Sequence, residues 1–287
     1  MQAEIVLTPT ESKKLIAAAV LQLPEVRDAL AKGIVTIHPS SSTIFMYEAL
    51  TGRLPEGIWV HGITVPKGLC ISKTALLKRF SSAPVVHDPR NNRSTWFFKK
   101  GRLQEQITLG EILDQMTETD VYIKGPNAVD PQGNVGVLYA NPAGGGGTIG
   151  RVIAARRRQH FHLLLPVGLE KLIPVSIAAA IKKAGFKKVN AAMGLPCGLI
   201  RVPGRKIDEV DALAILSGAE ATPIAAGGLA GAEGAIVLAV QGTDEQVQKA
   251  YDHCRSVKGA KLPELAILDC DACQYPTCHF APAGKRE

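Results

Sequence analysis

The residue pattern with the clearest chemical meaning is a glycine run followed by a hydroxyl and a cation. An apolar, strand-like run at 135–140 precedes it, and an apolar, then basic run at 152–158 follows. This order aims free backbone N–H groups and the positive end of a helix dipole at one point, which favours a phosphate or carboxylate. A tight turn without a ligand is the alternative, because glycine also serves turns. The candidate ligand-binding residues are Gly144, Gly145, Gly146, Gly147, Thr148 and Arg151.

A second polar loop follows the β-branched run at 34–37 and precedes an apolar run at 44–50. Hydroxyls at a helix start cap the helix, and they also bind oxyanions, so both interpretations stay open. A lysine that ends the run at 121–124 would add its charge to the N–H contacts of the glycine loop. The candidate ligand-binding residues of this group are Ser40, Ser41, Ser42, Thr43 and Lys124.

The C-terminal segment carries a second chemical constellation with the spacing Cys-x2-Cys-x4-Cys-His, formed by Cys270, Cys273, Cys278 and His279. Thiolate and imidazole bind zinc and iron, so these residues are candidate ligands of a zinc ion or an iron–sulfur cluster, with Cys197 and Cys254 as possible additions. A redox-active thiol pair and inert tail cysteines are the alternatives. A complete zinc ribbon is excluded, because no second Cys-x2-Cys pair occurs.

Composition narrows the class of protein and its partners. The chain has 287 residues, of which 46% are hydrophobic and 21% charged, as in a globular protein with a proper core. Aromatic residues make up only 5%, which argues against nucleic-acid binding by base stacking. The net charge of +7 suits acidic ligands but is spread along the chain. We expect a cytoplasmic homo-oligomer without membrane contact, whose cysteines are thiols or metal ligands.

The order of expected elements indicates the fold of the first part of the chain. Strand-like and helical patterns alternate, which predicts an α/β fold with a mostly parallel, doubly wound sheet. Ligands bind such sheets at the carboxyl ends of the strands. Thr10 is the expected helix N-cap near the N-terminus, and Thr108 with Glu111 forms a capping box. The expected elements are a helical region at 8–32, strands at 34–37, 57–65, 83–87, 94–98, 120–125 and 161–166, and a helix at 108–116.

After Pro174 the pattern changes. A helix at 175–184 is followed by the order β-α-β-β-α-β, which predicts a C-terminal ferredoxin-like α+β unit. Its expected strands lie at 188–193, 220–226, 235–240 and 265–268, and its helices at 208–216 and 244–257. The predicted domains are therefore an anion-binding α/β domain at 1–174, the ferredoxin-like unit at 175–268 and a cysteine-rich tail at 269–287.

The first ~175 residues resemble the superfamily of ribose-phosphate isomerases, glucosamine-phosphate deaminases and CoA transferases in the order of three landmarks. The hydroxyl loop at 40–43 is similar to the family's small polar loop between a strand and a helix. The segment from Lys124 to Asp130 stands where the isomerases have an acidic motif, and the four glycines stand where the family has its glycine loop. Lys171, after the strand at 163–165, is similar to a family lysine and becomes a candidate ligand-binding residue.

The resemblance implies a pocket for an anionic metabolite that is phosphorylated, CoA-linked or carboxylated, with the family's catalytic set changed. Asn127 and Ala128 replace the acidic pair that a sugar-phosphate isomerase needs as its base. Asn127 stays a candidate ligand-binding residue, and no glutamate stands where a CoA transferase needs its nucleophile. An isomerase or transferase with altered catalytic residues and a non-catalytic ligand sensor both stay open. A metal- or iron–sulfur-binding redox or accessory protein is the alternative.

Overall fold

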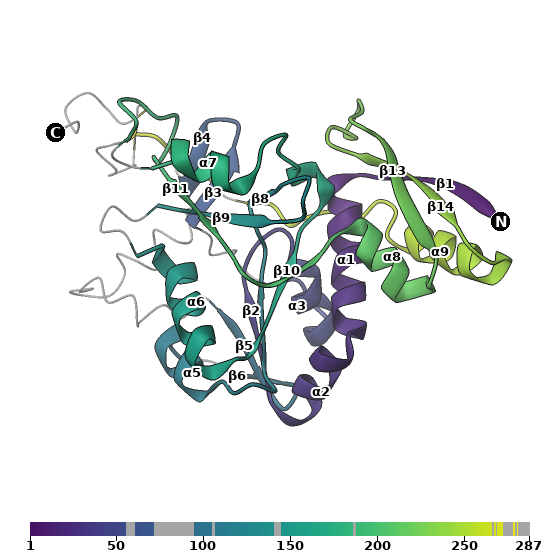
Figure 1. Cartoon of the computed structure of the whole chain (residues 1–287), viewed down its shortest axis with the longest axis horizontal. Helices are drawn as coiled ribbons and strands as arrows, with labels where there is room; N and C mark the ends of the chain where they lie inside the picture. The colour runs from purple at the N-terminus through teal and green to yellow at the C-terminus, as the bar shows by residue number, and fades with distance from the viewer. Residues whose placement is uncertain are drawn as a thin grey trace.

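A six-stranded, mostly parallel sheet forms the centre of the computed structural model (Figure 1). Within the residues that the structure describes, three smaller sheets accompany it. The described residues are 1–55, 61–71, 95–104, 107–140, 145–185, 188–265, 267, 269–271, 278 and 280, with the backbone alone for 61–63 and 71. The expected strand at 83–87 lies outside them. No helix in these ranges is long and apolar enough to cross a bilayer.

The strands of the central sheet follow the order β12-β10-β7-β2-β5-β6. The first four run parallel, as the sequence predicted, whereas β5 pairs with β2 and β6 in the antiparallel sense. Parallel strands need crossover connections, and helices supply them here. The strand bounds are β2 (Ile34–His38), β5 (Trp96–Lys99), β6 (Arg102–Gln104), β7 (Val121–Lys124), β10 (His162–Pro166) and β12 (Arg205–Ile207).

Helices cover both faces of this sheet, because alternate strand residues point to opposite sides. Ile37, Ile123 and Leu164 belong to the core cluster beneath α1 (Pro9–Gln22), α2 (Pro24–Lys32) and α3 (Ile44–Thr51). Tyr122 and Leu163 belong to the cluster beneath α5 (Leu109–Gln115) and α6 (Gly147–Gln159). Figure 1 shows α5 and α6 on the side of the sheet opposite α1.

Helix α1 begins at a different residue from the expected one. Thr8 is its N-cap, with Pro9 as the first helical residue and Glu11 completing a capping box. Proline fits that position because its missing N–H would have no helical partner. The expected cap at Thr10 is therefore wrong, since Thr10 lies inside the first turn. The capping box of Thr108 and Glu111 on α5 is confirmed.

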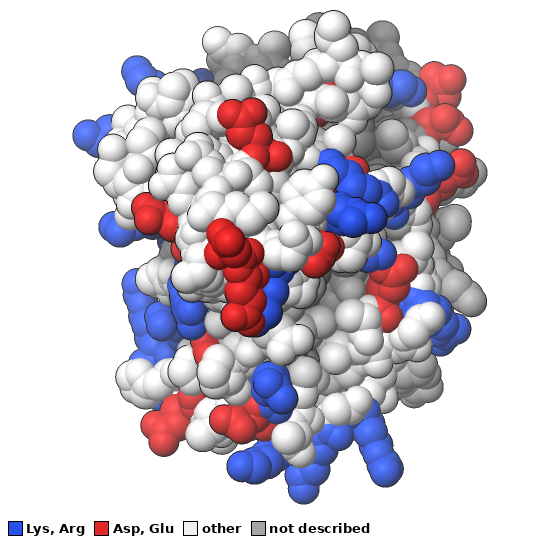
Figure 2. Space-filling view, turned by 90° about the vertical axis from the view of Figure 1, so that its right-hand side faces the viewer, with Lys and Arg blue, Asp and Glu red and all other residues white. Residues whose placement is uncertain are grey.

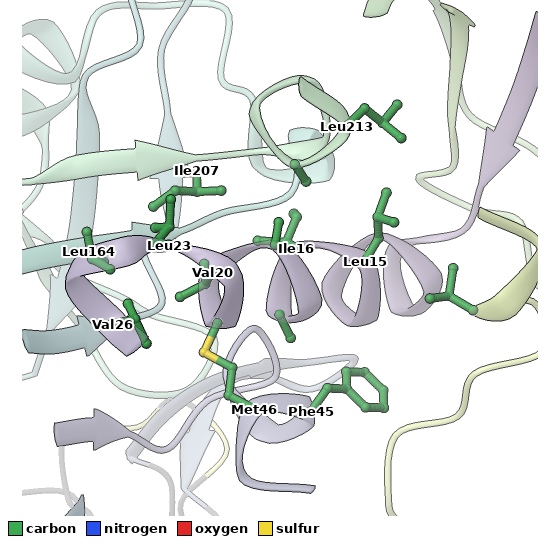
Figure 3. Close-up of a cluster of buried hydrophobic side chains, with 14 of the residues drawn as sticks. Leu15, Ile16, Val20, Leu23, Val26, Phe45, Met46, Leu164, Ile207 and Leu213 are labelled. Carbon is green, nitrogen blue, oxygen red and sulfur yellow. The ribbon is translucent and has the colours of Figure 1, made fainter. Parts of the chain in front are cut away.

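The apolar side of α1 faces the central sheet and its neighbouring helices (Figure 3). Leu15, Ile16 and Val20 are almost fully buried. Burial of one such side chain contributes about 1.5–3 kcal/mol. Figure 3 draws the following labelled residues around this core: Leu15, Ile16, Val20, Leu23, Val26, Phe45, Met46, Leu164, Ile207 and Leu213.

A second, antiparallel sheet has the order β1-β14-β13 and combines the two halves of the chain. Its strands are β1 (Gln2–Leu7), β13 (Glu220–Ala226) and β14 (Ile236–Gln241), with α8 (Glu209–Ser217) and α9 (Asp244–Ser256). The sequence predicted β13, β14 and both helices but assigned no strand to residues 2–7. In Figure 1, α1 stands between the central sheet and α8, so one core serves both sheets.

The expected first strand of a ferredoxin-like unit, at 188–193, is wrong. These residues form no strand, and most of them are exposed. Asn and Ala have low strand propensity, and this segment lacks the alternating burial that would stabilise a strand. The strand that pairs with β14 opposite β13 is β1 instead. The expected last strand at 265–268 includes residues 266 and 268, which lie outside the described residues.

Two small sheets complete the fold. One has the order β11-β9-β8, from β11 (Gly198–Arg201), β9 (Val135–Tyr139) and β8 (Ala128–Val129). The other is the hairpin of β3 (His61–Val65) and β4 (Gly68–Ile71). The helix expected at 175–184 is present as α7 (Ile177–Lys183), and a short 3-10 helix, η2 (Leu169–Lys171), follows β10.

Asp120 joins the amino ends of three central strands through its side chain and its backbone. Asp120 Oδ1 accepts a hydrogen bond from the N–H of Ile34 at 2.6 Å, where β2 begins. Its backbone oxygen accepts from the N–H of His162 at 2.9 Å, where β10 begins. Asp120 itself directly precedes β7, and its Oδ2 accepts from the N–H of Thr117 at 2.7 Å. Asp120 is 3% exposed, so water cannot replace these bonds.

We expect Asp120→Ala to lower the free energy of unfolding by roughly 1–3 kcal/mol, because it leaves the buried N–H of Ile34 without an acceptor. Urea unfolding followed by circular dichroism measures the change. Asp114→Ala, at an exposed position of α5, is the matched control and should stay within about 0.5 kcal/mol of the unchanged protein. Equal stability of the two variants would contradict the role given to Asp120.

Candidate functional site

The carboxyl ends of β2, β7 and β10 meet at one edge of the central sheet, because the three strands are parallel neighbours. His38, Lys124 and Pro166 are their last residues. The loops that follow carry most of the polar residues singled out in the sequence. This edge is therefore the place where the predicted ligand-binding residues can meet.

The hydroxyl loop after β2 uses two of its side chains to hold its own shape. Thr43 Oγ1 donates to the backbone oxygen of His38 at 2.7 Å and accepts from the N–H of Ser40 at 3.0 Å. Ser40 Oγ lies 3.1 Å from Thr43 Oγ1. Ser41 is exposed and Ser42 is buried. Thr43 stands at the N-cap of α3 but makes no side-chain cap bond there, so its hydroxyl fixes the loop rather than the helix.

Lys171 connects this loop to the end of β7. Its Nζ donates to Ser42 Oγ at 2.8 Å and to the backbone oxygen of Pro126 at 3.0 Å. Lys124 lies on the same stretch of backbone, and its Nζ donates to the oxygen of Gly125 at 2.8 Å. A side chain on Gly125 would collide with Ser40 Oγ at 2.4 Å, so the β7 loop and the hydroxyl loop are in close contact. The structure thus brings the two predicted lysines and the hydroxyl loop together.

Both lysine amines have lowered pKa values. Burial lowers the pKa of Lys124 to about 7, and the charge of Lys171 adds to the effect. Burial also lowers the pKa of Lys171 to about 8; the charge of Lys13 lowers it further, while Glu170 and Glu209 oppose the change. An amine with a pKa near neutrality gains protonation when an anion binds beside it.

His38 and Tyr122 form a polar group on the α6 side of the sheet that was not predicted from the sequence. His38 and Lys124 are register partners on β2 and β7, and Tyr122 lies two residues before Lys124 on the same face. The Tyr122 hydroxyl lies 3.3 Å from His38 Nδ1. Burial raises the pKa of Tyr122, and the positive charge of Arg151 from α6 opposes that rise. Period-two alternation along 34–38 and 121–124 was the signal that would have found His38 and Tyr122.

The glycine loop leads directly into α6. Gly145, Gly146 and Gly147 all have positive φ, between 60° and 73°, a conformation that other residues rarely adopt. Gly146 is the N-cap of α6, and Thr148 is half-buried in the first turn. Gly144 lies outside the described residues. The first-turn N–H groups of the 13-residue α6 have no partner within the helix. Glycine is thus required by the backbone conformation, and both interpretations of the loop stay open.

Asn127 turns toward the small sheet. Its Oδ1 accepts from the N–H of Leu138 at 3.0 Å, and its own N–H donates to the oxygen of Gly136 at 2.8 Å. Both partners belong to β9. The predicted ligand-binding residue therefore uses its amide oxygen to tie the β7 loop to β9.

Asp130 ends the segment that was compared with the acidic motif of the isomerases, and its carboxylate organises the backbone around it. Its carboxylate accepts hydrogen bonds from the N–H groups of Gln132, Asn134 and Ile177, the last at the start of α7. Burial acts to raise the pKa of Asp130, but these donors outweigh it and lower the pKa. Its exposed fraction is 2%, so this carboxylate organises the turn and the start of α7.

Two carboxylates lie behind Lys171, where the central sheet meets α1 and α8. Glu170 pairs with Lys13 at 2.8 Å, and Glu209 accepts from the N–H of Leu169 at 2.9 Å. A side-chain carbon on Gly168 would lie within 3.2 Å of an oxygen of each carboxylate. Burial raises the pKa of Glu209 to about 7, and the nearby charge of Glu170 raises it further. Glu170, Glu209 and Lys13 are not among the candidate site residues predicted from the sequence.

The metal prediction at the C-terminus is not tested by the structure. Cys270 and Cys278 are half-buried free thiols, whereas Cys273 and His279 lie outside the described residues. Across the described ranges, no group of three or more metal-ligating side chains occurs. Burial raises the pKa of Cys254 to about 12, and it also raises the pKa of Cys197. Raised pKa values disfavour the thiolate that a metal requires at these two added positions.

Comparison of the chain with protein-family models, curated proteins and solved structures found no significant match.

The buried amine of Lys124 gives a pH prediction. The unfolded chain keeps a lysine pKa near 10.5, whereas the folded pKa is about 7. Between these values the unfolded state binds more protons, so this group makes folding stability rise with pH. We expect Lys124→Met to lose that rise, so its stability relative to the unchanged protein is greatest below the folded pKa and declines at alkaline pH.

Urea unfolding across this pH range measures the difference. Lys99→Met, at an exposed lysine that ends β5, is the control and should show a nearly constant difference. A constant difference for Lys124→Met as well would show that its amine keeps an ordinary pKa.

Proposed function

We propose that this chain binds a small phosphorylated, CoA-linked or carboxylated metabolite at the carboxyl edge of its six-stranded sheet. One observation carries the proposal. The amines of Lys124 and Lys171 make their described hydrogen bonds to neutral oxygens of Gly125, Pro126 and Ser42. Partly buried lysine amines whose hydrogen bonds go to neutral oxygens favour an incoming anion, which would stabilise their charged forms.

The neighbourhood of these lysines supports the same ligand class. Arg151 lies on α6 close enough to act on Tyr122, which stands beside Lys124 on β7. The positive end of the α6 dipole lies at Gly147, four residues before Arg151. The net positive charge of the chain adds a long-range attraction. On the face in Figure 2, Lys and Arg as well as Asp and Glu are scattered among residues of other kinds, so that face carries no large uniform cationic area.

We also propose that the central sheet belongs to the isomerase and CoA-transferase type. The parallel order β10-β7-β2, the helices on both faces and the loops after β2 and β7 support this assignment. The chemistry then departs from that of the sugar-phosphate isomerases. Asn127 has an amide in place of a carboxylate, and the Asp130 carboxylate is held by backbone N–H groups, so neither supplies a free carboxylate base. The carboxylates near Lys171 are Glu170 and Glu209, from different elements.

Binding of inorganic phosphate is the simplest test. A ligand that binds only the folded state stabilises it by about 2.7 kcal/mol at 100 times its dissociation constant. We expect phosphate, and more strongly a sugar phosphate or a CoA ester, to raise the thermal midpoint above that in sodium chloride of equal ionic strength. Lys171→Met and Arg151→Ala should each remove most of this increase, because each deletes one cation from the site.

Lys99→Met is the control and should respond to phosphate as the unchanged protein does, since Lys99 is exposed at the opposite end of the central sheet. The proposal fails if phosphorylated, CoA-linked and carboxylated compounds all leave the midpoint at its sodium chloride value. An equal response of Lys99→Met and Lys171→Met would place the anion elsewhere.

A further inference from the structure

The surroundings of Lys124 differ from those of Lys13 and Lys206, which are both paired with carboxylates. Lys13 pairs with Glu170, and Lys206 lies against two carboxylates, Asp208 and Asp211. Among the described residues, no carboxylate pairs with Lys124, and its amine donates to the backbone oxygen of Gly125 alone. The contrast shows in the pKa values, because the carboxylates raise the pKa of Lys206 despite its burial, whereas burial lowers that of Lys124 to about 7.

A lysine becomes a nucleophile when burial and a second cation keep its amine neutral near pH 7. Both conditions hold at the end of β7, since Lys124 is half-buried and the charge of Lys171 acts on it. The other titratable groups around it are His38 on β2, Tyr122 on β7 and Arg151 on α6. None of them is a carboxylate that would restore the charge of the amine. Lys171 and Arg151 can hold an anionic group while the neutral fraction of the Lys124 amine reacts with another part of the same molecule.

We propose that Lys124 forms an imine with an aldehyde or ketone that carries a phosphate or carboxylate group. The inference rests on the proposed anion site and names the substrate class and the reacting atom. The lone pair of Nζ forms a bond to the carbonyl carbon, and the carbonyl oxygen takes up a proton. The resulting carbinolamine then loses water to give a protonated imine. One amine, one carbonyl and one proton become one iminium ion and one water molecule, without an oxidant or reductant.

The residues that would hold the anionic group lie at the same edge of the sheet. Lys171 binds Ser42 and the backbone oxygen of Pro126, and the start of α6, which carries Arg151, packs on the face of the sheet that carries Tyr122. The hydroxyl of Tyr122 and the imidazole of His38 form a pair at 3.3 Å next to the register partner Lys124. Such a pair can exchange the protons that addition and loss of water require.

Reductive trapping tests the inference. The probe is pyridoxal 5′-phosphate, an aldehyde with a phosphate group, followed by sodium borohydride and peptide mass spectrometry. We expect the label at Lys124 in preference to exposed lysines, with protection by excess inorganic phosphate. Pyridoxal without the phosphate should label Lys124 roughly tenfold less at equal concentration, because it lacks the charge-assisted hydrogen bonds that hold the probe.

Two matched variants test whether Lys124 is the reacting amine. Lys124→Arg cannot form an imine, so it should lose the label at position 124. Lys99→Arg should keep that label and the stabilisation by phosphate. If Lys124→Arg folds poorly, mapping the labelled lysines of the unchanged protein still shows whether Lys124 forms the imine.

The two proposals fail in different ways. Label spread over exposed lysines and absent from Lys124, in a protein that phosphate stabilises, would overturn the imine and leave the anion site intact. Label at Lys124 that phosphate does not prevent would overturn the shared site. A protein that phosphate neither stabilises nor protects from labelling would remove the proposed function itself.

Discussion

The alignment of three parallel strands by Asp120 is the constraint on which the candidate site depends. Its carboxylate and backbone oxygen bind the first residues of β2 and β10, and the residue itself leads into β7. A parallel strand advances by about 3.3 Å per residue, so a common start fixes which side chains emerge at the far edge. His38 and Lys124 become neighbours there for that reason, and the loop containing Lys171 follows at the same level. A slip of one residue would turn Lys124 to the opposite face.

The sequence was sufficient to predict individual helices and strands and the mostly parallel arrangement of the main sheet. Glycine and β-branched residues marked β2, and the Thr108–Glu111 pair marked the start of α5. The partner of β1 could not be predicted from the sequence. The residues of a strand with one buried face do not specify which strand pairs with it, and this partner lies more than two hundred residues away. The strand expected at 188–193 failed for a different reason, because Asn and Ala have low strand propensity and the segment lacks the alternating burial that would stabilise a strand.

The candidate site was predicted in part, and the missing part has a physical cause. Each polar or glycine-rich loop, such as the one with Ser42 or the one with Gly146, can be recognised from its own residues. The His38–Tyr122 pair exists only through the register of two strands, and the Glu170–Glu209 pair only through the packing of α8 on the loop after β10. Asn127 and Asp130 show the converse, since both are polar residues in the expected place that serve the backbone.

The pairing of β1 with β14 has a consequence for how the chain acquires its structure. Met1 and Gly242, 241 positions apart, are hydrogen-bonded to each other. Contacts between distant segments form slowly, because the intervening chain must lose its freedom before they stabilise anything. During synthesis on the ribosome, β1 therefore has no partner strand until β14 (Ile236–Gln241) has emerged. Completion of this small sheet is a late event in biogenesis, and it completes the core cluster that α1 shares with β7, the strand that carries Lys124.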